Sequence, residues 1–390
     1  MINLSAFYKV SKTAYLVAFI TFCIRAGHFM SLPFLAIYLT GDGLFSSGQI
    51  GLILGISGFT LSVTGLFNGM YIDRTSYKKI MVFSLLFSGI GYFCFTLSMK
   101  SFFFLLLINA TLGWLRSLIE VSLMTILKEN TKPEDLSYAF SARFIGANLG
   151  VVLGPLIGGL MAQNHSLLIF IIAGFLNIFL GFVMLFFKEV NHTRGINQHK
   201  LLTHFNLVIK DKLLLQLTLI NFILWLVYVL LDTTLPQHLA HTVKNPAAIF
   251  SVLMIINALI CVFFQPIILR WAELTSLKLF GIIGCVMFSS SFLLLSAFSD
   301  FSIMILSVVL MSFGELFTMP INSLLVMKVA PRELIASYNG LYSLGMLGIS
   351  LGPLLGGMGL EFIGSRFTFL IAGVLPFIAA LIYILNTDDF

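Results

Sequence analysis

Twelve apolar stretches, each long enough to cross a bilayer as a helix, constrain this chain more than any other feature. A membrane-spanning helix needs about 20 apolar residues, and twelve such segments follow one another along the 390 residues. Hydrophobic residues make up 59% of the chain and charged residues only 10%, whereas a soluble domain carries about 25% charged residues. We expect an all-α membrane protein with helices at 14–39, 47–71, 80–98, 102–127, 137–161, 166–187, 213–239, 247–270, 278–298, 301–327, 336–360 and 367–385.

A polar segment at 188–212 separates the first six predicted helices from the last six. We therefore predict an N-terminal six-helix bundle at 1–187, a cytoplasmic linker at 188–212 and a C-terminal six-helix bundle at 213–390. The first apolar stretch exceeds a signal-peptide core and has no small-residue cleavage site, so it is expected to be retained. The four cysteines lie in apolar segments and are expected to pack as small hydrophobic residues, with no disulfide and no metal site.

The distribution of lysine and arginine predicts the orientation. With the N-terminus inside, the inner loops and tails hold sixteen of these residues and the outer loops hold three. Positive charge is enriched on the cytoplasmic side of membrane proteins, so both termini are expected to be cytoplasmic. The formal net charge of +6 is then a consequence of topology and contact with lipid headgroups, and we expect no nucleic-acid partner.

Two short sequences with a proline between glycines are near copies of each other. "GVVLGPLIGG" at 150–159 and "GISLGPLLGG" at 348–357 are 198 residues apart and share seven of ten positions. Two six-helix halves related in this way are typical of a large class of transporters. The glycines allow close helix approach, and each proline removes a backbone hydrogen bond and permits a bend. We predict hinge and packing points, with tight packing alone as the alternative, at Gly150, Gly154, Pro155, Gly158, Gly352, Pro353 and Gly356.

Six charged residues lie within predicted spans: Arg25, Arg116, Arg143, Glu120, Asp232 and Glu315. A charge at bilayer depth costs about 2.5–3.5 kcal/mol, so these side chains are expected to face a protein interior or a water-filled cavity. Polar residues spaced three and four apart form one face on the first, fourth, seventh and tenth helices. The predicted substrate cavity consists of Arg25, His28, Asn109, Arg116, Asn221, Trp225, Tyr228, Thr318 and Asn322.

Three motifs carry a resemblance to a known family. "GANLGVVLGPLIGG" (146–159) matches the antiporter pattern of helix five, "NGMYIDRTSYKK" (68–79) matches the loop 2–3 signature, and "GHFMSLPFLA" (27–36) is similar to a helix-one pattern. Through them the chain resembles the major facilitator superfamily, and within it the twelve-helix drug:proton antiporters. Ser76, Tyr77 and Ala36 depart from these patterns, and the second glycine–proline copy falls on helix eleven, where the antiporter motif does not belong.

The resemblance implies roles for particular residues. The loop signature implies a cytoplasmic conformational latch formed by Gly69, Asp73, Arg74 and Lys78. The same four helices that carry the polar faces line the central cavity in the family.

Among the embedded acids, Glu315 is the first candidate for proton coupling, because it lies near the middle of its span, where desolvation favours the protonated form. Glu120 and Asp232 are further candidates. The alternatives are that Glu315 is a structural hydrogen-bonded acid, that Arg116 and Glu120, one turn apart, neutralise each other, and that Asp232 belongs to an outer vestibule. Arg143 is expected to bond groups on the inner side.

No phosphate-binding loop, nucleophile elbow or Cys/His cluster is present in the sequence, so we expect neither an enzyme nor a cofactor. We predict a monomeric, proton-coupled antiporter of a bacterial inner membrane that exports an amphipathic small molecule or drug by alternating access. Three alternatives stay open: a transporter of a specific metabolite such as a carboxylate siderophore, a lipid or glycolipid flippase, and a membrane sensor or scaffold.

Overall fold

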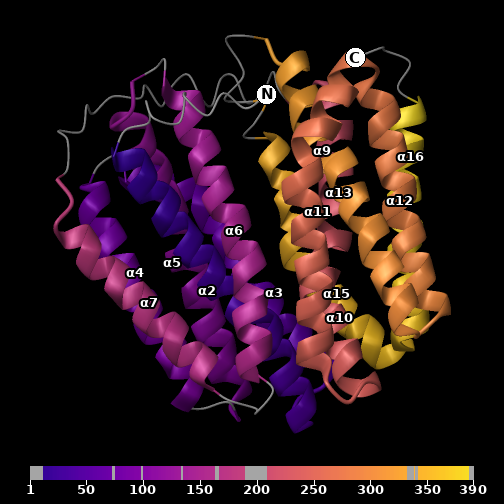
Figure 1. Ribbon diagram of the computed structural model, residues 1–390, viewed down its shortest axis with the longest axis horizontal. Helices are drawn as coiled ribbons and strands as arrows, with labels where there is room; N and C mark the ends of the chain where they lie inside the picture. Colours follow the sequence, from indigo (N-terminus) through magenta and orange to yellow (C-terminus); the bar gives the residue numbers. More distant parts are fainter. Residues whose placement is uncertain are drawn as a thin grey trace. The chain divides into compact units, whose positions relative to one another are not determined.

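The computed structural model describes residues 12–72, 75–97, 100–132, 135–162, 167–188, 209–331, 338 and 341–385. Within these ranges the regular structure is helical, and twelve spans are long and apolar enough to cross a membrane, which confirms the all-α prediction (Figure 1). The first six are α2 (Lys12–Asp42), α3 (Ser47–Ile72), α4 (Tyr77–Leu97), α5 (Phe102–Glu129), α6 (Leu136–Ala162) and α7 (Leu168–Leu185).

The second half begins with α9 (Lys212–Tyr228) and α10 (Leu230–Thr242), which together form one span. It continues with α11 (Pro246–Leu274), α12 (Leu277–Ala297), α13 (Phe301–Val329), the short 3₁₀ helix η2 (Leu344–Leu347), α15 (Gly348–Phe362) and α16 (Gly364–Leu385). The span predicted at 213–239 is thus interrupted at Val229. There the N–H of Asp232 bonds to the carbonyl of Val229, three residues earlier, which tightens the backbone locally.

The chain forms two compact units. The first contains Met1–Phe45, Ile56–Gly195 and Val243–Ser251, and the second contains Ser46–Gly55, Ile196–Thr242 and Val252–Phe390. The start of α3 therefore belongs to the second unit, and the start of α11 belongs to the first. The boundaries at 187 and 213 stay a prediction, and most of the predicted linker lies outside the described residues.

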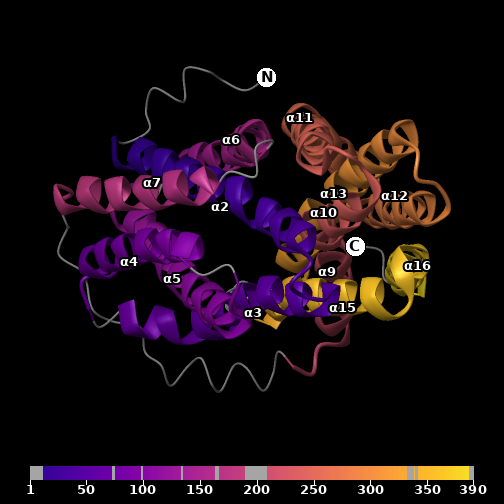
Figure 2. The same ribbon diagram turned by 90° about the horizontal axis from the view of Figure 1, so that it is seen from below.

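In the first unit, α2 packs along α6, and α4 packs against α7 and α5 (Figure 2). An apolar cluster in this unit contains Ile20, Leu85, Leu118, Leu123 and Leu180, which are all buried. In the second unit, α12 packs against α13 and α16, and α9 packs against α15, η2 and α16. Because lipid is as apolar as these side chains, close packing rather than a hydrophobic driving force holds such helices together.

The start of α9 is fixed by two interactions of one carboxylate. Asp211 Oδ1 accepts hydrogen bonds from the N–H groups of Leu213 (3.0 Å) and Leu214 (3.1 Å), and so caps the helix. Asp211 Oδ2 accepts a 2.5 Å hydrogen bond from the hydroxyl of Tyr338. Burial, together with this hydrogen bond and the nearby carboxylate charge, raises the pKa of Tyr338 to about 12.

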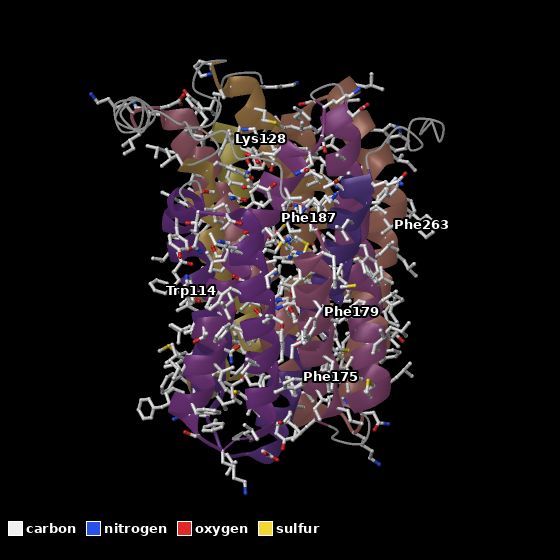
Figure 3. All side chains as sticks on the ribbon, turned by 90° about the vertical axis from the view of Figure 1, so that its left-hand side faces the viewer. Trp114, Lys128, Phe175, Phe179, Phe187 and Phe263 are labelled. Atoms are coloured by element: carbon white, nitrogen blue, oxygen red, sulfur yellow. The ribbon has the colours of Figure 1, made fainter. Side chains whose placement is uncertain are left out.

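Large aromatic side chains cover the outside of the first unit. Trp114 on α5 is 39% exposed, and Phe175 and Phe179 on α7 are 63% and 55% exposed, pointing away from the helices in Figure 3. Exposed apolar surface of this extent marks a region that meets an apolar environment. The outer surface therefore agrees with the prediction of a lipid-embedded protein.

Candidate functional site

The glycines of α6 lie against the backbone of α2. A Cβ atom added at Gly150 would stand 2.6 Å from the carbonyl oxygen of Phe22, and one at Gly154 would stand 2.7 Å from that of Ala26. One at Gly158 would overlap the ring of Phe34. The residues on α6 predicted as packing points therefore line the seam between α6 and α2.

The second copy of the motif makes the equivalent seam in the second unit. A Cβ at Gly352 would lie 2.6 Å from the carbonyl oxygen of Leu226 on α9, and one at Gly356 would overlap Thr234 on α10. Pro155 and Pro353 lie inside α6 and α15, which continue through them. Bending at these prolines stays a prediction.

Glu120 lies between two arginines from two other helices. One carboxylate oxygen of Glu120, on α5, accepts from Arg25 of α2 at 3.2 Å, and the other accepts from Arg143 of α6. The three side chains are 14–30% exposed. Charge-assisted hydrogen bonds at both oxygens favour the ionised carboxylate, so the arrangement fits a structural clamp joining α2, α5 and α6.

Arg116 and His28 form a second polar pair in the first unit. The Nη1 of Arg116 lies 2.8 Å from Nε2 and 3.2 Å from Nδ1 of His28. A guanidinium has donors only, so the imidazole is the acceptor. Arg116 also acts electrostatically on Glu120, one turn away on α5, whereas the direct ion pairs of Glu120 are with Arg25 and Arg143. Mutual neutralisation of Arg116 and Glu120 stays a prediction.

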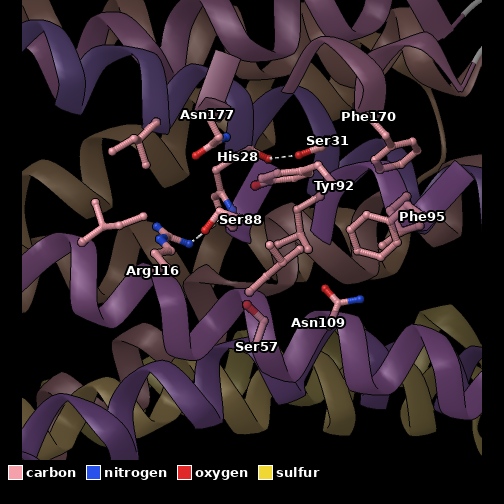
Figure 4. Close-up of a pocket in the computed structure, with 15 residues that line it drawn as sticks. His28, Ser31, Ser57, Ser88, Tyr92, Phe95, Asn109, Arg116, Phe170 and Asn177 are labelled. Atoms are coloured by element: carbon pink, nitrogen blue, oxygen red, sulfur yellow. Dashed lines mark hydrogen bonds between the residues drawn. The ribbon is translucent and has the colours of Figure 1, made fainter. Parts of the chain in front are cut away.

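A cavity in the first unit lies beside this pair (Figure 4). Arg116 and Asn109 come from α5, and His28 comes from α2. Asn109 is buried and donates a hydrogen bond to the carbonyl of Leu105. Five further polar residues on its wall were not predicted from the sequence, where a polar residue within an apolar span was the signal: Ser31, Ser57, Ser88, Tyr92 and Asn177.

Glu315 of α13 has a different environment from Glu120. Its Oε2 accepts hydrogen bonds from Asn257 Nδ2 at 3.2 Å and from the Cys261 thiol at 3.5 Å, both on α11. Asn257 also donates to Ser312 at 3.0 Å. Among the described residues, the hydrogen-bond partners of this carboxylate are thus neutral. Asn257 and Cys261 were not predicted as site residues, although an asparagine four residues before a cysteine is an unusual polar pair in an apolar helix.

Two predicted cavity residues of the second unit bond to neighbouring helices, and a third bonds within its own helix. Asn221 donates to the carbonyl of Tyr342 at 3.2 Å, and Asn322 donates to that of Leu217 at 3.0 Å. Thr318 bonds back to Gly314 within α13 at 2.7 Å.

Three other predicted site residues lie on α9 and α10. Trp225 and Tyr228 make an edge-to-face ring contact with centroids 5.5 Å apart. Asp232 is buried in the first turn of α10.

The predicted latch is only partly within the described residues. Gly69 lies in α3, and Lys78 is half-buried in the first turn of α4. Asp73 and Arg74 lie outside the described residues. The part of the chain that the structure describes contains no group of three or more His, Cys, Asp or Glu side chains able to hold a metal ion.

The helical spans, the paired glycine seams and the embedded charges together define a polytopic membrane protein of the transporter class. The sequence profile of the Major Facilitator Superfamily matches residues 17–347 and 217–389. The chain belongs to this family. The fold is that of a nucleoside transporter, NupG, whose crystal structure as a variant superposes with a TM-score of 0.82 at 16% identity, covering 96% of this chain and 99% of that one.

Two bacterial relatives have named activities. The chain is 22% identical over 396 residues to a Na(+), Li(+), K(+)/H(+) antiporter of Planococcus maritimus, with 93% of each protein covered. It is 26% identical over 178 residues to the quinolone resistance protein NorA of Staphylococcus aureus, a match that covers 45% of this chain and 44% of NorA.

Proposed function

We propose that this transporter is a proton-coupled antiporter that exports an amphipathic small molecule. The observation that carries the proposal is the contrast between the two embedded glutamates. Glu120 is held ionised by two arginines, whereas Glu315 is hydrogen-bonded by the neutral side chains of Asn257 and Cys261. A desolvated carboxylate with neutral neighbours takes up a proton without leaving an arginine unpaired, so Glu315 is assigned as the proton carrier.

The direction of transport and the nature of the cargo are proposed from a sequence motif and from one relative. The helix-five antiporter motif and the partial match to NorA favour export of a drug-like molecule. The excess of lysine and arginine in the inner loops favours cytoplasmic termini. The bacterial relatives favour a location in a bacterial inner membrane. The transporter is proposed to act as a monomer.

Purified protein in liposomes with an imposed pH gradient tests the proposal, with nalidixate, an amphipathic carboxylate, as the probe. Glu315→Gln is expected to abolish the dependence of nalidixate movement on the gradient, and Glu315→Asp to retain part of it. Asp300→Asn is the matched control, because Asp300 is exposed and its side chain makes no capping hydrogen bond. Unchanged gradient dependence in Glu315→Gln contradicts the assignment.

Exchange of an alkali cation for protons is the second candidate. It is favoured by the match to the Planococcus maritimus antiporter along 93% of both chains. In addition, the Asn257 amide nitrogen donates both to the Glu315 carboxylate and to the Ser312 hydroxyl oxygen, and carboxylate and hydroxyl oxygens suit hard cations. Addition of NaCl, LiCl or KCl to the same liposomes is expected to dissipate the pH gradient only if this second candidate is right.

A further inference from the structure

The cavity beside Arg116 and His28 lies wholly within the first unit and is built by five helices. Its polar wall includes Ser57 from α3, Ser88 and Tyr92 from α4, and Asn177 from α7, in addition to residues of α2 and α5. In Figure 4, Arg116 lies toward one end, while Phe95 and Phe170 lie toward the other. The rings of Phe95 and Phe170 are 5.2 Å apart. The cavity thus has a cationic, hydrogen-bonding end and an aromatic end.

The charge of this region is positive. Away from the helix ends, the described helices of the first unit carry three arginines and one glutamate. Glu120 is shared by Arg25 and Arg143, and none of these three residues is among the cavity-lining residues. Of the fifteen described residues that line the cavity, Arg116 is the one with a formal charge. Such a cavity attracts an anion and repels a cation.

His28 directs this charge without cancelling it. The imidazole nitrogen that accepts from Arg116 at 2.8 Å carries no proton, so the ring is a neutral acceptor for one guanidinium nitrogen. A T-shaped contact with Phe29, with centroids 5.3 Å apart, supports the ring from the side. The planar guanidinium is thereby oriented at the edge of the cavity, and guanidinium groups match planar carboxylates better than any other cation does.

The size of the cavity limits what enters it. The cavity volume is about 40 Å³, and about 10–15 Å³ holds one water. This is room for a head group of a few heavy atoms and not for a complete drug-sized molecule.

We propose that this cavity is a subsite for a carboxylate group, held by Arg116, and that the exported molecule is an amphipathic organic anion. The apolar part adjoining the carboxylate then lies toward Phe95 and Phe170. This inference rests on the proposed transport function and specifies the class of substrate.

Binding of a matched pair of probes tests the proposal on the purified full-length chain. Benzoate and benzamide have nearly the same shape but differ in charge, and both are measured against sodium chloride at equal ionic strength. Unfolding is followed with a thiol-reactive dye, because Cys23, Cys261 and Cys285 are buried in the folded protein. Benzoate at ten times its Kd is expected to raise Tm by roughly 2 °C or more, while benzamide and sodium chloride leave it unchanged.

Two arginine variants assign the effect to the cavity. Arg116→Gln is expected to abolish the benzoate shift, and Arg143→Gln, the matched loss of an embedded arginine outside the cavity, to keep it. If the Arg116→Gln variant cannot be purified in a folded state, Arg116→Lys replaces it, because lysine retains the charge but not the planar guanidinium. Arg116→Lys is expected to reduce the benzoate-induced rise in Tm by at least half. Inorganic phosphate serves as the tetrahedral anion and is expected to give the smaller shift.

Equal shifts with benzoate and benzamide, a shift reproduced by sodium chloride, or a benzoate shift retained in Arg116→Gln would overturn the proposal. A larger shift with phosphate would overturn the carboxylate assignment. Glu315→Gln is expected to keep the benzoate shift while losing proton coupling. Absence of a benzoate shift in the unmodified protein therefore refutes the subsite alone, whereas unchanged gradient dependence in Glu315→Gln refutes the proton site alone.

Discussion

Gly154 stands so close to Ala26 that a Cβ atom added to it would lie 2.7 Å from the Ala26 carbonyl oxygen and 2.9 Å from the Cβ of Phe29. The obstacle is the backbone of α2, which does not rotate away as a flexible side chain does. The position 198 residues later behaves in the same way, because a Cβ at Gly352 would meet the carbonyl oxygen of Leu226 at 2.6 Å. Both copies of the repeated motif therefore act first as packing seams, each within its own unit.

Gly154→Ala is expected to lower Tm, because overpacking of a close-packed contact costs about 1–3 kcal/mol. The thiol-dye unfolding assay measures the change. Gly41→Ala is the matched control, since Gly41 also lies in a helix and a Cβ there meets nothing within 4 Å. Equal Tm values for the two variants would show that the contact between α6 and α2 accommodates an added methyl group, contrary to the distances in the structure.

Removing the negative charge between two arginines is expected to destabilise the first unit. Glu120→Gln leaves Arg25 and Arg143 facing each other without the shared carboxylate. Loss of one partner from a fully buried pair costs about 3–5 kcal/mol, and partial exposure of these side chains reduces the expected cost to about 1–3 kcal/mol. The loss is measured as a decrease in Tm.

A double-mutant cycle separates this charge effect from a change of shape. Arg143→Gln combined with Glu120→Gln removes one charge of each sign, so its destabilisation is expected to be smaller than the sum of the single effects. Strict additivity would mean that the contact contributes no coupling energy. Glu120 would then again be a candidate for proton coupling, as its position within the span suggested.

The hydrogen bond between Tyr338 and Asp211 predicts a loss of stability at alkaline pH. The pKa of Tyr338 is raised from 10.0 to about 12 in the folded protein, so the protonated tyrosine favours folding. Its contribution is complete below about pH 10, where an unfolded-chain tyrosine is also protonated. It declines as the pH rises from there toward about 12. Tyr338→Phe is expected to flatten the fall in Tm between pH 9 and pH 11.

The same pH series on Tyr71→Phe provides the comparison, because Tyr71 is 57% exposed. That variant is expected to keep the alkaline fall in Tm of the unmodified protein. If Tyr338→Phe and Tyr71→Phe give the same curves, other groups set the alkaline limit.

The twelve spans were predictable because hydropathy is a local property, summed over a stretch of about 20 residues. Which charged side chains contact each other was not predictable from the sequence. Spacing along α5 placed Arg116 next to Glu120, but the partners of Glu120 come from α2 and α6, 95 and 23 residues away. Only the packing of the three helices brings them together, and a single sequence carries no measure of that distance.

The environment of Glu315 illustrates the same limit. Its position in the middle of α13 was readable from the sequence, and it made this residue the first candidate. Its neutral partners Asn257 and Cys261 lie on α11, more than 50 residues earlier. Their polar character was visible in the sequence, but their direction toward α13 depends on helix rotation, which hydropathy does not determine when a span is apolar nearly all round.

Asn322 gives the last prediction, because the sequence placed it in the substrate cavity and the structure gives it two bonds to neighbouring helices. It is fully buried, donates to the carbonyl of Leu217 at 3.0 Å and accepts from the hydroxyl of Tyr383 at 3.2 Å. Asn322→Leu is expected to lower stability by about 0.6–1.7 kcal/mol, the range of interhelical hydrogen bonds in membranes, and Tyr383→Phe by less. An Asn322→Leu variant that keeps its Tm but no longer transports nalidixate into or out of liposomes would instead support a role for Asn322 in the substrate cavity.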